Sequence, residues 1–179
     1  AFIELASGLV AEHRLDWREI DAISVEVDEV HQMLVAPLAR KQAPAVAIDA
    51  KFSIPFTLAL ALVRGGVTLD DFEEESLSAP DILALAARVS PVTAQPGAWP
   101  RGLGGGVEIS MRDGRRFSAR AHDAVGSPER PLSRSQLIDK FVDCLGRAAR
   151  PKSADEARKL ASAILGLADC VDVGALLSG

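Results

Sequence analysis

The chain has 179 residues, of which 48% are hydrophobic and 25% charged, and this suits one globular domain, or one domain and part of another. The net charge of −5 argues against nonspecific nucleic-acid binding, which needs an excess of lysine and arginine. The longest apolar run, Ile54 to Val63, is about half of what a bilayer requires, and no signal-peptide pattern opens the chain. We therefore expect a cytoplasmic protein without nucleic-acid or membrane partners.

The opening third of the chain predicts a helix, a strand and an irregular segment. Apolar residues recur at helical spacing over residues 1–13. The sequence opens inside this pattern and without methionine, so we expect it to be part of a longer chain. Residues 22–27 alternate between apolar and polar, which is typical of a half-buried strand. Residues 28–44 favour irregular structure with one helical turn, because Pro37 and Pro44 interrupt the pattern.

The segment from Asp49 to Gly66 predicts a buried helix. Ser53 can accept a hydrogen bond from a first-turn backbone N–H, and Pro55 is tolerated in that turn. The body FTLALALV is apolar almost all round, as in helices buried on most sides, and Gly65 can supply the left-handed residue that ends it. Lys51 beside the cap could face an anion, although a lysine there more often extends into solvent.

Short elements follow this helix. Residues 68–71 form a capping-box pattern that begins a short helix. The acidic residues within 70–75 are interpreted as a solvated face. Residues 79–89 have the apolar spacing of another helix, and a short strand is expected over residues 89–94.

The clearest local signal is a β-hairpin over residues 107–122, where apolar and polar residues alternate on both sides of the turn Asp113-Gly114. Four polar groups alternate along its second strand and could bind carboxylates, although a solvated sheet face is the simpler interpretation: Arg116, Ser118, Arg120 and His122. The glycine-rich run 102–106 invites a phosphate-loop reading. Because a strand follows instead of a helix, we interpret the run as a mobile loop.

The C-terminal region predicts two more helices. Ser133 and Ser153 each open a capping box, Pro151 ends the first helix, and residues 172–178 form a last turn. The order of helix, strand, helices, strand, hairpin and helices indicates an α+β fold. We expect a two-layer sandwich, with a mostly antiparallel sheet, helices packed on one face and additional C-terminal helices.

Cysteine and histidine show no metal-binding or disulfide pattern. Cys144 and Cys170 match no zinc spacing and are too few for a disulfide framework, so we expect both to be buried apolar groups. The three histidines, His13, His31 and His122, are far apart in sequence. His31 follows the first strand and enters a loop, where functional residues concentrate, although an exposed loop histidine without a special role is more common. No set of residues forms a complete catalytic site.

Three features in this order resemble the MmgE/PrpD family, which includes 2-methylcitrate dehydratase, cis-aconitate decarboxylase and iminodisuccinate epimerase. The first is DAKFSIPFTLALALVRGGVTLDDF over residues 49–72, and the last is GSPERPLSRSQLIDKF over residues 126–141. The hairpin with Asp113-Gly114 lies between them. The resemblance covers nearly the whole chain.

The resemblance implies a two-domain, homodimeric enzyme in which a large helical domain and a smaller α+β lid domain enclose the active site. It implies a lyase or isomerase that acts on small polycarboxylates by proton abstraction next to a carboxylate, without a metal or organic cofactor. Residues 1–150 correspond to the lid domain. Residues 151–179 correspond to a helical tail expected to pack on the absent N-terminal helical domain or on a partner chain.

The resemblance places the catalytic residues outside this sequence, so the fragment alone is expected to be inactive. The loop 29–32 follows the first lid strand and in the family approaches the cleft, which makes His31 and Gln32 candidates for substrate contact. Two alternatives stay open, a non-catalytic module that binds a partner or small anions, and a purely structural dimerisation domain. The sequence does not distinguish dehydration, decarboxylation and epimerisation.

Overall fold

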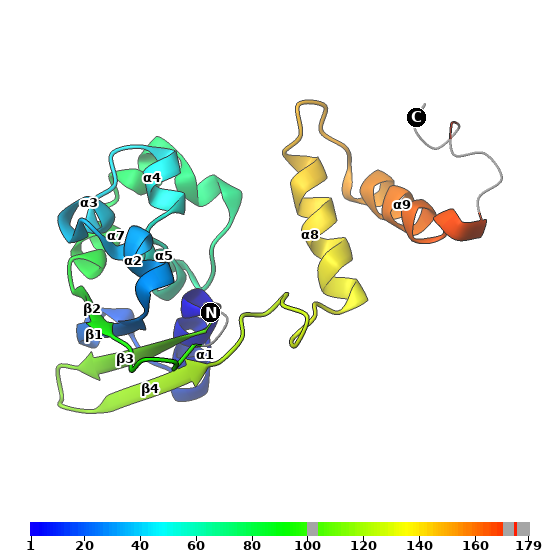
Figure 1. The fold of residues 1–179 in the computed structure, drawn as a ribbon. Coiled ribbons are helices and arrows are strands. Elements are labelled where there is room, and N and C mark those ends of the chain that lie inside the picture. Colours follow the sequence, from blue (N-terminus) through cyan, green and yellow to red (C-terminus); the bar gives the residue numbers. More distant parts are fainter. Residues whose placement is uncertain (100–103, 170–173, 175–179) are drawn as a thin grey trace. The chain divides into compact units, whose positions relative to one another are not determined.

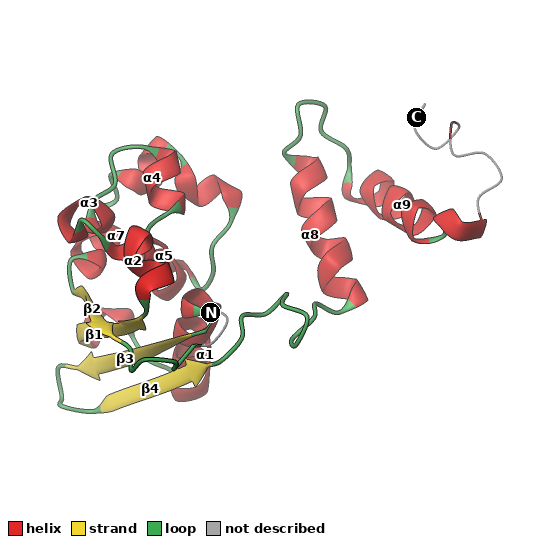
Figure 2. Ribbon diagram, viewed as in Figure 1, coloured by secondary structure: helices red, strands yellow, loops and turns green. Residues whose placement is uncertain are grey.

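A computed structural model describes residues 1–99, 104–169 and 174. The chain divides into two compact units, Ala1–Arg130 and Pro131–Gly179, and each is described by itself. Figure 1 labels the elements along the chain, and Figure 2 distinguishes helices, strands and loops. The expected fold class is confirmed, because the structure is α+β with one mostly antiparallel four-stranded sheet and further C-terminal helices.

The sheet of the first unit has the strand order β2-β1-β3-β4. Its strands are β1 Ile20–Val27, β2 Val89–Thr93, β3 Gly105–Met111 and β4 Arg116–Ala121. Strand β1 is parallel to β2 and antiparallel to β3, and β3 and β4 form the predicted antiparallel hairpin. Gly114 adopts a φ of 86° in the hairpin turn, where glycine avoids the steric cost that other residues meet.

The helices of the first unit come mainly from the segment between β1 and β2. They are α1 Phe2–His13, α2 Gln32–Val35, α3 Leu38–Gln42, α4 Ala47–Lys51, α5 Ile54–Arg64, α6 Glu74–Leu77 and α7 Pro80–Ala86. Three short 3-10 helices complete the set: η1 Trp17–Glu19, η2 Glu29–His31 and η3 Leu69–Phe72. The segment 28–44 therefore carries η2, α2 and α3, more helix than the single turn expected from its sequence.

Helix α5 is the central helix, as its sequence predicts. Ser53 Oγ accepts a hydrogen bond from the backbone N–H of Phe56 at 3.0 Å, and Gly65 ends the helix with a φ of 81°. The Ser53 hydroxyl also donates to the carbonyl oxygen of Lys41, so one side chain caps α5 and joins it to the end of α3. Buried residues occupy nearly every position of the helix: Ile54, Pro55, Phe56, Leu58, Ala59, Leu60, Ala61 and Leu62.

The core lies between the helices and one face of the sheet. Figure 1 shows α2, α3, α4, α5 and α7 on the same side of the sheet. The inward side chains of β1 alternate as expected and are almost fully buried: Ile23, Val25 and Val27. Inward residues of β3 join the same cluster as residues of α1, α5 and α7. This burial leaves the opposite sheet face to polar residues.

The interpretation of the acidic run 70–75 as a solvated face is wrong for Asp71, which is 5% exposed. Its Oδ2 accepts hydrogen bonds from the backbone N–H of Thr68 at 2.6 Å and from the Thr68 hydroxyl at 2.9 Å. Its Oδ1 pairs with the guanidinium of Arg64. Burial raises the pKa of Asp71, but the Thr68 and Arg64 hydrogen bonds outweigh burial and hold the pKa below its usual value.

The second unit contains α8 Arg134–Gly146, α9 Ala154–Leu165 and the 3-10 helix η4 Leu167–Asp169. Both predicted capping boxes are present, with Gln136 N donating to Ser133 Oγ at 3.2 Å and Glu156 N donating to Ser153 Oγ at 3.4 Å. Helix α8 ends at Gly146, before Pro151.

The compact units do not divide at residue 150. Helix α8 packs against α9, and the first unit ends at Arg130. The assignment of residues 1–150 to a lid domain and of residues 151–179 to a tail that packs elsewhere stays a prediction.

The expectation of two buried cysteines is wrong for Cys144, which is exposed on α8. No residue of α8 is buried within the described structure, so the packing that would enclose a small apolar side chain there is absent. Cys170 and nearly all of the predicted last turn, 172–178, lie outside the described residues.

Among the residues that the structure describes, no helix is both long enough and apolar enough to cross a bilayer.

Candidate functional site

One end of the sheet brings together several side chains that could take part in binding or catalysis. Because β1 and β2 are parallel and β3 is antiparallel to β1 and β4, three strands finish where β3 begins. The residues at this end are Asp28 after β1, Ala94 after β2, Gly104 before β3 and His122 after β4. The backbone N–H of Ala94 donates to the Val27 carbonyl at 2.8 Å, which extends the β1–β2 pairing to this edge.

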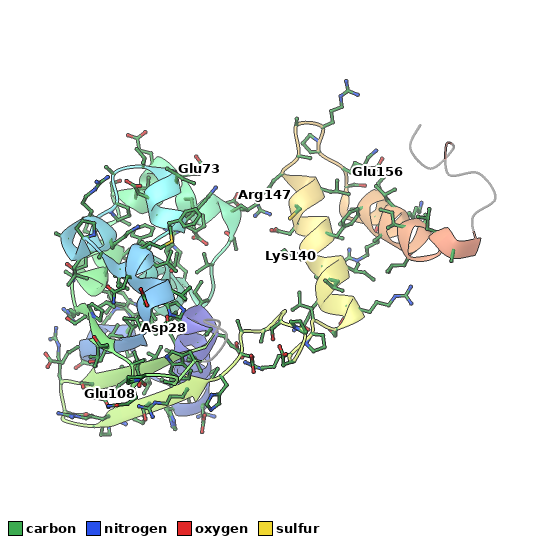
Figure 3. All side chains as sticks on the ribbon, viewed as in Figure 1. Asp28, Glu73, Glu108, Lys140, Arg147 and Glu156 are labelled. Atoms are coloured by element: carbon green, nitrogen blue, oxygen red, sulfur yellow. The ribbon has the colours of Figure 1, made fainter. Side chains whose placement is uncertain are left out.

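His31 lies at this end of the sheet and is not an exposed loop residue. Its exposed fraction is 7%, and it forms the last residue of η2. Ring atom Nδ1 lies 2.7 Å from Oδ1 of Asp28, which is labelled in Figure 3. Asp28 also caps η2, since Oδ1 accepts from the backbone N–H of Val30 at 3.1 Å. A histidine held by a carboxylate in this way can take part in proton transfer or hydrogen bonding.

Two pairs of rings lie at this end of the sheet. The Phe2 ring meets the His31 ring edge-on, with centroids 5.2 Å apart and planes at 90°. The Trp99 ring lies 5.7 Å from the His122 ring. Trp99 is 6% exposed, and its Nε1 is buried without a hydrogen-bond partner among the described residues. We call Phe2, Asp28, His31, Trp99 and His122 the sheet-end cluster.

Two glycines allow this packing. A Cβ built on Gly104 would lie 2.5 Å from Cε3 of Trp99, and one built on Gly105 would lie 2.7 Å from Cε1 and Cζ of Phe2. The run 102–106 was interpreted as a mobile loop, and this is wrong for Gly105 and Gly106, which belong to β3. Residues 102 and 103 lie outside the described residues. The absence of side chains here serves the close approach of aromatic rings.

Gln32 is exposed and begins α2, directly after His31 in sequence. Two apolar neighbours are exposed with it, Val30 at 63% and Met33 at 65%. The segment 29–33 therefore carries one buried histidine, an exposed amide and two exposed apolar side chains. This combination offers both polar and apolar contacts to whatever lies against this edge.

The outer face of the sheet is polar and solvated, which was the simpler of the two interpretations. The side chains of Arg116 and Arg120 are 72% and 70% exposed. Each is already close to a carboxylate: Arg120 Nε lies 2.8 Å from Glu26 Oε2, and Arg116 lies 3.8 Å from Glu108. Figure 3 labels Glu108 on this sheet. His122 follows the end of β4, and its ring lies 5.7 Å from the ring of Trp99.

A shallow hollow of about 540 Å³ lies on this outer face and includes the side chains of Ser24, Glu26, Glu108, Ser118 and Arg120. Donors and acceptors are mixed there, because Glu26 pairs with Arg120 inside the hollow and Glu108 lies near Arg116, which is on the same strand as Arg120. A polycarboxylate would therefore have to compete with Glu26 and Glu108 for the arginines. The sheet-end cluster has no such competition described for it, and His31 and Gln32 stay the predicted contacts.

The other candidates from the sequence have structural roles. Lys51 is exposed, and its Nζ lies 5.4 Å from the centroid of the Phe72 ring, so its ammonium group makes a cation–π contact. Ser53 caps α5. Within the described residues, no group of three or more His, Cys, Asp and Glu side chains is placed to hold a metal ion.

Sequence reasoning selected His31 and Gln32 as candidates, and this choice stays a prediction, but it missed the residues that contact His31. The signal for Asp28 was present, since an aspartate before a short helix is a typical N-cap. Phe2 and Gly105 could not be assigned to the site because both reach it through contacts distant in sequence.

Comparison with known proteins gives a family. The sequence profile of the MmgE/PrpD C-terminal domain matches residues 1–165. Cis-aconitate decarboxylase of Homo sapiens is 24% identical over 133 residues, which are 73% of this chain and 27% of that protein. The chain thus spans about a quarter of the length of this curated relative. Because the family match covers the whole first unit and reaches the end of α9, the chain belongs to the MmgE/PrpD family and represents its C-terminal domain.

Proposed function

We propose that this chain is the C-terminal part of a cofactor-independent lyase or isomerase that acts on small polycarboxylates. The observation that carries the proposal is the family match over residues 1–165. The name of the relative, cis-aconitate decarboxylase, supports the substrate class. The chemistry is removal of a proton next to a carboxylate, followed by loss of water or carbon dioxide or by reprotonation.

Such a reaction needs a positioned base and hydrogen-bond donors aimed at the charge that develops on the substrate. The described residues provide one pair suited to this environment, His31 with Asp28. In the proposal, His31 and Gln32 contact the substrate from the end of the sheet. The principal acid–base residues come from a helical domain upstream in sequence, and the intact enzyme works as a homodimer.

The surface around His31 supports this placement. Val30 and Met33 are exposed on either side of the pair His31 and Gln32, and neighbouring exposed apolar side chains can form part of a surface that meets another domain or a ligand. Burial of these side chains against a helical domain would also exclude water from the ring of His31. On the outer sheet face, by contrast, the arginines extend into solvent and already lie close to carboxylates.

The proposal is tested with the intact protein that carries this sequence and, in parallel, with the 179-residue chain alone. Each is incubated in D2O with cis-aconitate and with 2-methylcitrate, and product formation and deuterium uptake are followed by proton NMR. We expect turnover or exchange with the intact protein and none with the chain alone, because the chain lacks a complete acid–base set. Binding of these acids without turnover or exchange by the intact protein would instead favour the non-catalytic binding module.

A further inference from the structure

We propose that Asp28 is a positioning residue, which keeps the proton of the neutral His31 ring on Nδ1 and leaves Nε2 as the atom that meets the substrate. This inference rests on the proposed function, in which His31 contacts a polycarboxylate. The family match does not provide it. It follows from the contacts of Asp28 with the ring and with the backbone of η2.

The carboxylate of Asp28 is held from two directions. Its Oδ1 lies 2.7 Å from Nδ1 of His31. The same oxygen accepts from the backbone N–H groups of Val30 at 3.1 Å and of His31 at 3.3 Å. The carboxylate therefore cannot rotate away from the ring without losing its bonds to the backbone. Both functions of Asp28, the cap of η2 and the hold on the ring, depend on a single oxygen atom.

The chemistry of the Asp28–His31 pair determines which ring nitrogen of the neutral imidazole carries the proton. An ionised carboxylate only accepts hydrogen bonds, whereas a neutral imidazole has one donor and one acceptor nitrogen. The nitrogen facing Asp28 must therefore be the donor, and the lone pair of the neutral ring lies on Nε2. When the ring takes a second proton, that proton also goes to Nε2. His31 can thus accept from a substrate hydroxyl when neutral and donate to a substrate carboxylate when charged, with the same atom.

A second contact limits the rotation of the ring. The Phe2 ring lies edge-on to His31 at 5.2 Å and is itself 8% exposed. Phe2 has room in this position because Gly105 has no side chain. The hydrogen bond to Asp28 fixes the Nδ1 side of the imidazole, and Phe2 restricts its tilt. A ring bounded in this way needs little reorganisation when substrate binds, which is what pre-organised sites provide.

The first test is spectroscopic and does not depend on activity. The 179-residue chain is labelled with nitrogen-15 at its three histidines, and the His31 ring signals are identified by their loss in His31→Gln. At a pH where the ring is neutral, we expect nitrogen shifts of a single tautomer with the proton on Nδ1. A ring with its proton on Nε2, or a mixture of both tautomers, would overturn the inference whatever the enzyme does.

Substitutions separate the charge of Asp28 from its geometry. In Asp28→Asn the backbone donors favour an amide oxygen at the same place, so the Nδ1–H tautomer should remain. In Asp28→Ala the acceptor is lost, and both tautomers should appear. Asp16→Ala is the matched control, because Asp16 caps η1 by accepting from Arg18 N at 3.0 Å and has no such histidine contact. An unchanged tautomer in Asp28→Ala would overturn the inference. Should that variant not fold, Asp28→Ser keeps a capping oxygen on a shorter side chain without a charge, and both tautomers should then appear as well.

The same variants in the intact enzyme test the link to function. We expect Asp28→Ala to lower kcat/KM for cis-aconitate roughly tenfold, about the effect of losing one charge-assisted hydrogen bond, and Asp28→Asn to retain more activity. Asp16→Ala should match wild type. Full activity of Asp28→Ala would overturn the positioning role. His31→Gln then distinguishes failure of the positioning role from failure of the proposed substrate contact. Loss of activity in that variant keeps the contact between His31 and the substrate, and full activity removes this contact as well.

Discussion

Arg120 and Glu26 form an ion pair across β3, although the strands that carry them, β4 and β1, are not neighbours. The residue between them in the register is Gly106, which pairs with Glu26 on one side and with Arg120 on the other. A Cβ on Gly106 would lie 2.8 Å from Glu26 Oε2 and 3.3 Å from Arg120 Cγ. The glycine thus leaves open the path along which the two side chains meet.

Replacing each of the two neighbouring glycines of β3 with alanine should change the free energy of unfolding by different amounts. Gly105→Ala forces the buried Phe2 ring to move, and overpacking of this kind typically costs about 1–3 kcal/mol. Gly106→Ala displaces a pair whose arginine is mostly exposed, so the free energy of unfolding should change by less than about 1 kcal/mol. Urea unfolding of both variants measures the difference. Gly8→Ala is the control without steric conflict, because a Cβ there meets nothing within 4 Å, and alanine inside α1 should keep or raise stability. Equal losses at 105 and 106 would contradict the assigned contacts.

The acid dependence of stability should involve Asp71. Its pKa is lowered in the folded chain, so in acid the unfolded state binds more protons than the folded state. The stability from Asp71 is therefore fully present above the ordinary aspartate pKa and is lost as the pH falls through the lowered value. Asp71→Asn should be less stable than wild type at neutral pH, and the gap should narrow in acid.

Urea midpoints of wild type and Asp71→Asn at several pH values between about 2.5 and 7 test this expectation. Glu74→Gln, at an exposed acid in the same run, is the matched control and should leave the pH dependence of the midpoint unchanged. A constant gap between wild type and Asp71→Asn across the whole range would show that the Thr68 and Arg64 contacts do not favour the charged form.

The caps of α5 and α8 should differ in their effect on the first unit. Ser53→Ala removes the bond from Phe56 N and the link to Lys41, so we expect a loss of about 1–2 kcal/mol. Ser133→Ala removes the cap of α8, in the second compact unit. Amide hydrogen exchange measures the local stability of both compact units in each variant. Protection of α5 and β1 should fall in Ser53→Ala and stay unchanged in Ser133→Ala, whereas a fall in both would contradict the division at Arg130.

The apolar positions of α9 provide a further test of that division. Ile164 and Leu165 are 43% and 51% exposed, and Leu160 is half-buried. Replacing all three with glutamate should leave unfolding of residues 1–130, followed by Trp17 and Trp99 fluorescence, unchanged. Loss of structure throughout the chain would mean that α9 belongs to the core of the first unit.

Local signals in the sequence determined much of the fold. The cap at Ser53, the Asp113-Gly114 turn and both C-terminal capping boxes depend on residues within a few positions of one another, and all four are present. The parallel pairing of β2 with β1 was not expected, because it joins segments more than sixty residues apart. The burial of His31 was missed for the same reason, because it depends on Phe2 and Gly105. For Asp71 the capping box with Thr68 was predicted, but the ion pair with Arg64, which helps to bury the carboxylate, was not.

In the candidate site, too, local features could be predicted and contacts between distant residues could not. Position after a strand was enough to select His31 and Gln32, but it could not show that the ring of His31 is enclosed. Burial depends on Phe2, twenty-nine positions earlier, and on the missing side chain of Gly105, more than seventy positions later. Exposure of Cys144 likewise reflects α8, whose described residues lack the packing that a small apolar side chain needs.

The central claim is that the sheet end around His31, and not the outer sheet face, meets the substrate. The most direct measurement is kcat/KM for cis-aconitate and 2-methylcitrate in the intact enzyme, for His31→Ala and Gln32→Ala against Arg116→Ala and Arg120→Ala, with folding checked by circular dichroism. We predict a loss of roughly tenfold or more for His31→Ala, a few-fold loss for Gln32→Ala, and near wild-type values for both arginine variants. Larger losses for the arginine variants than for His31→Ala would contradict the account and place the substrate on the outer face.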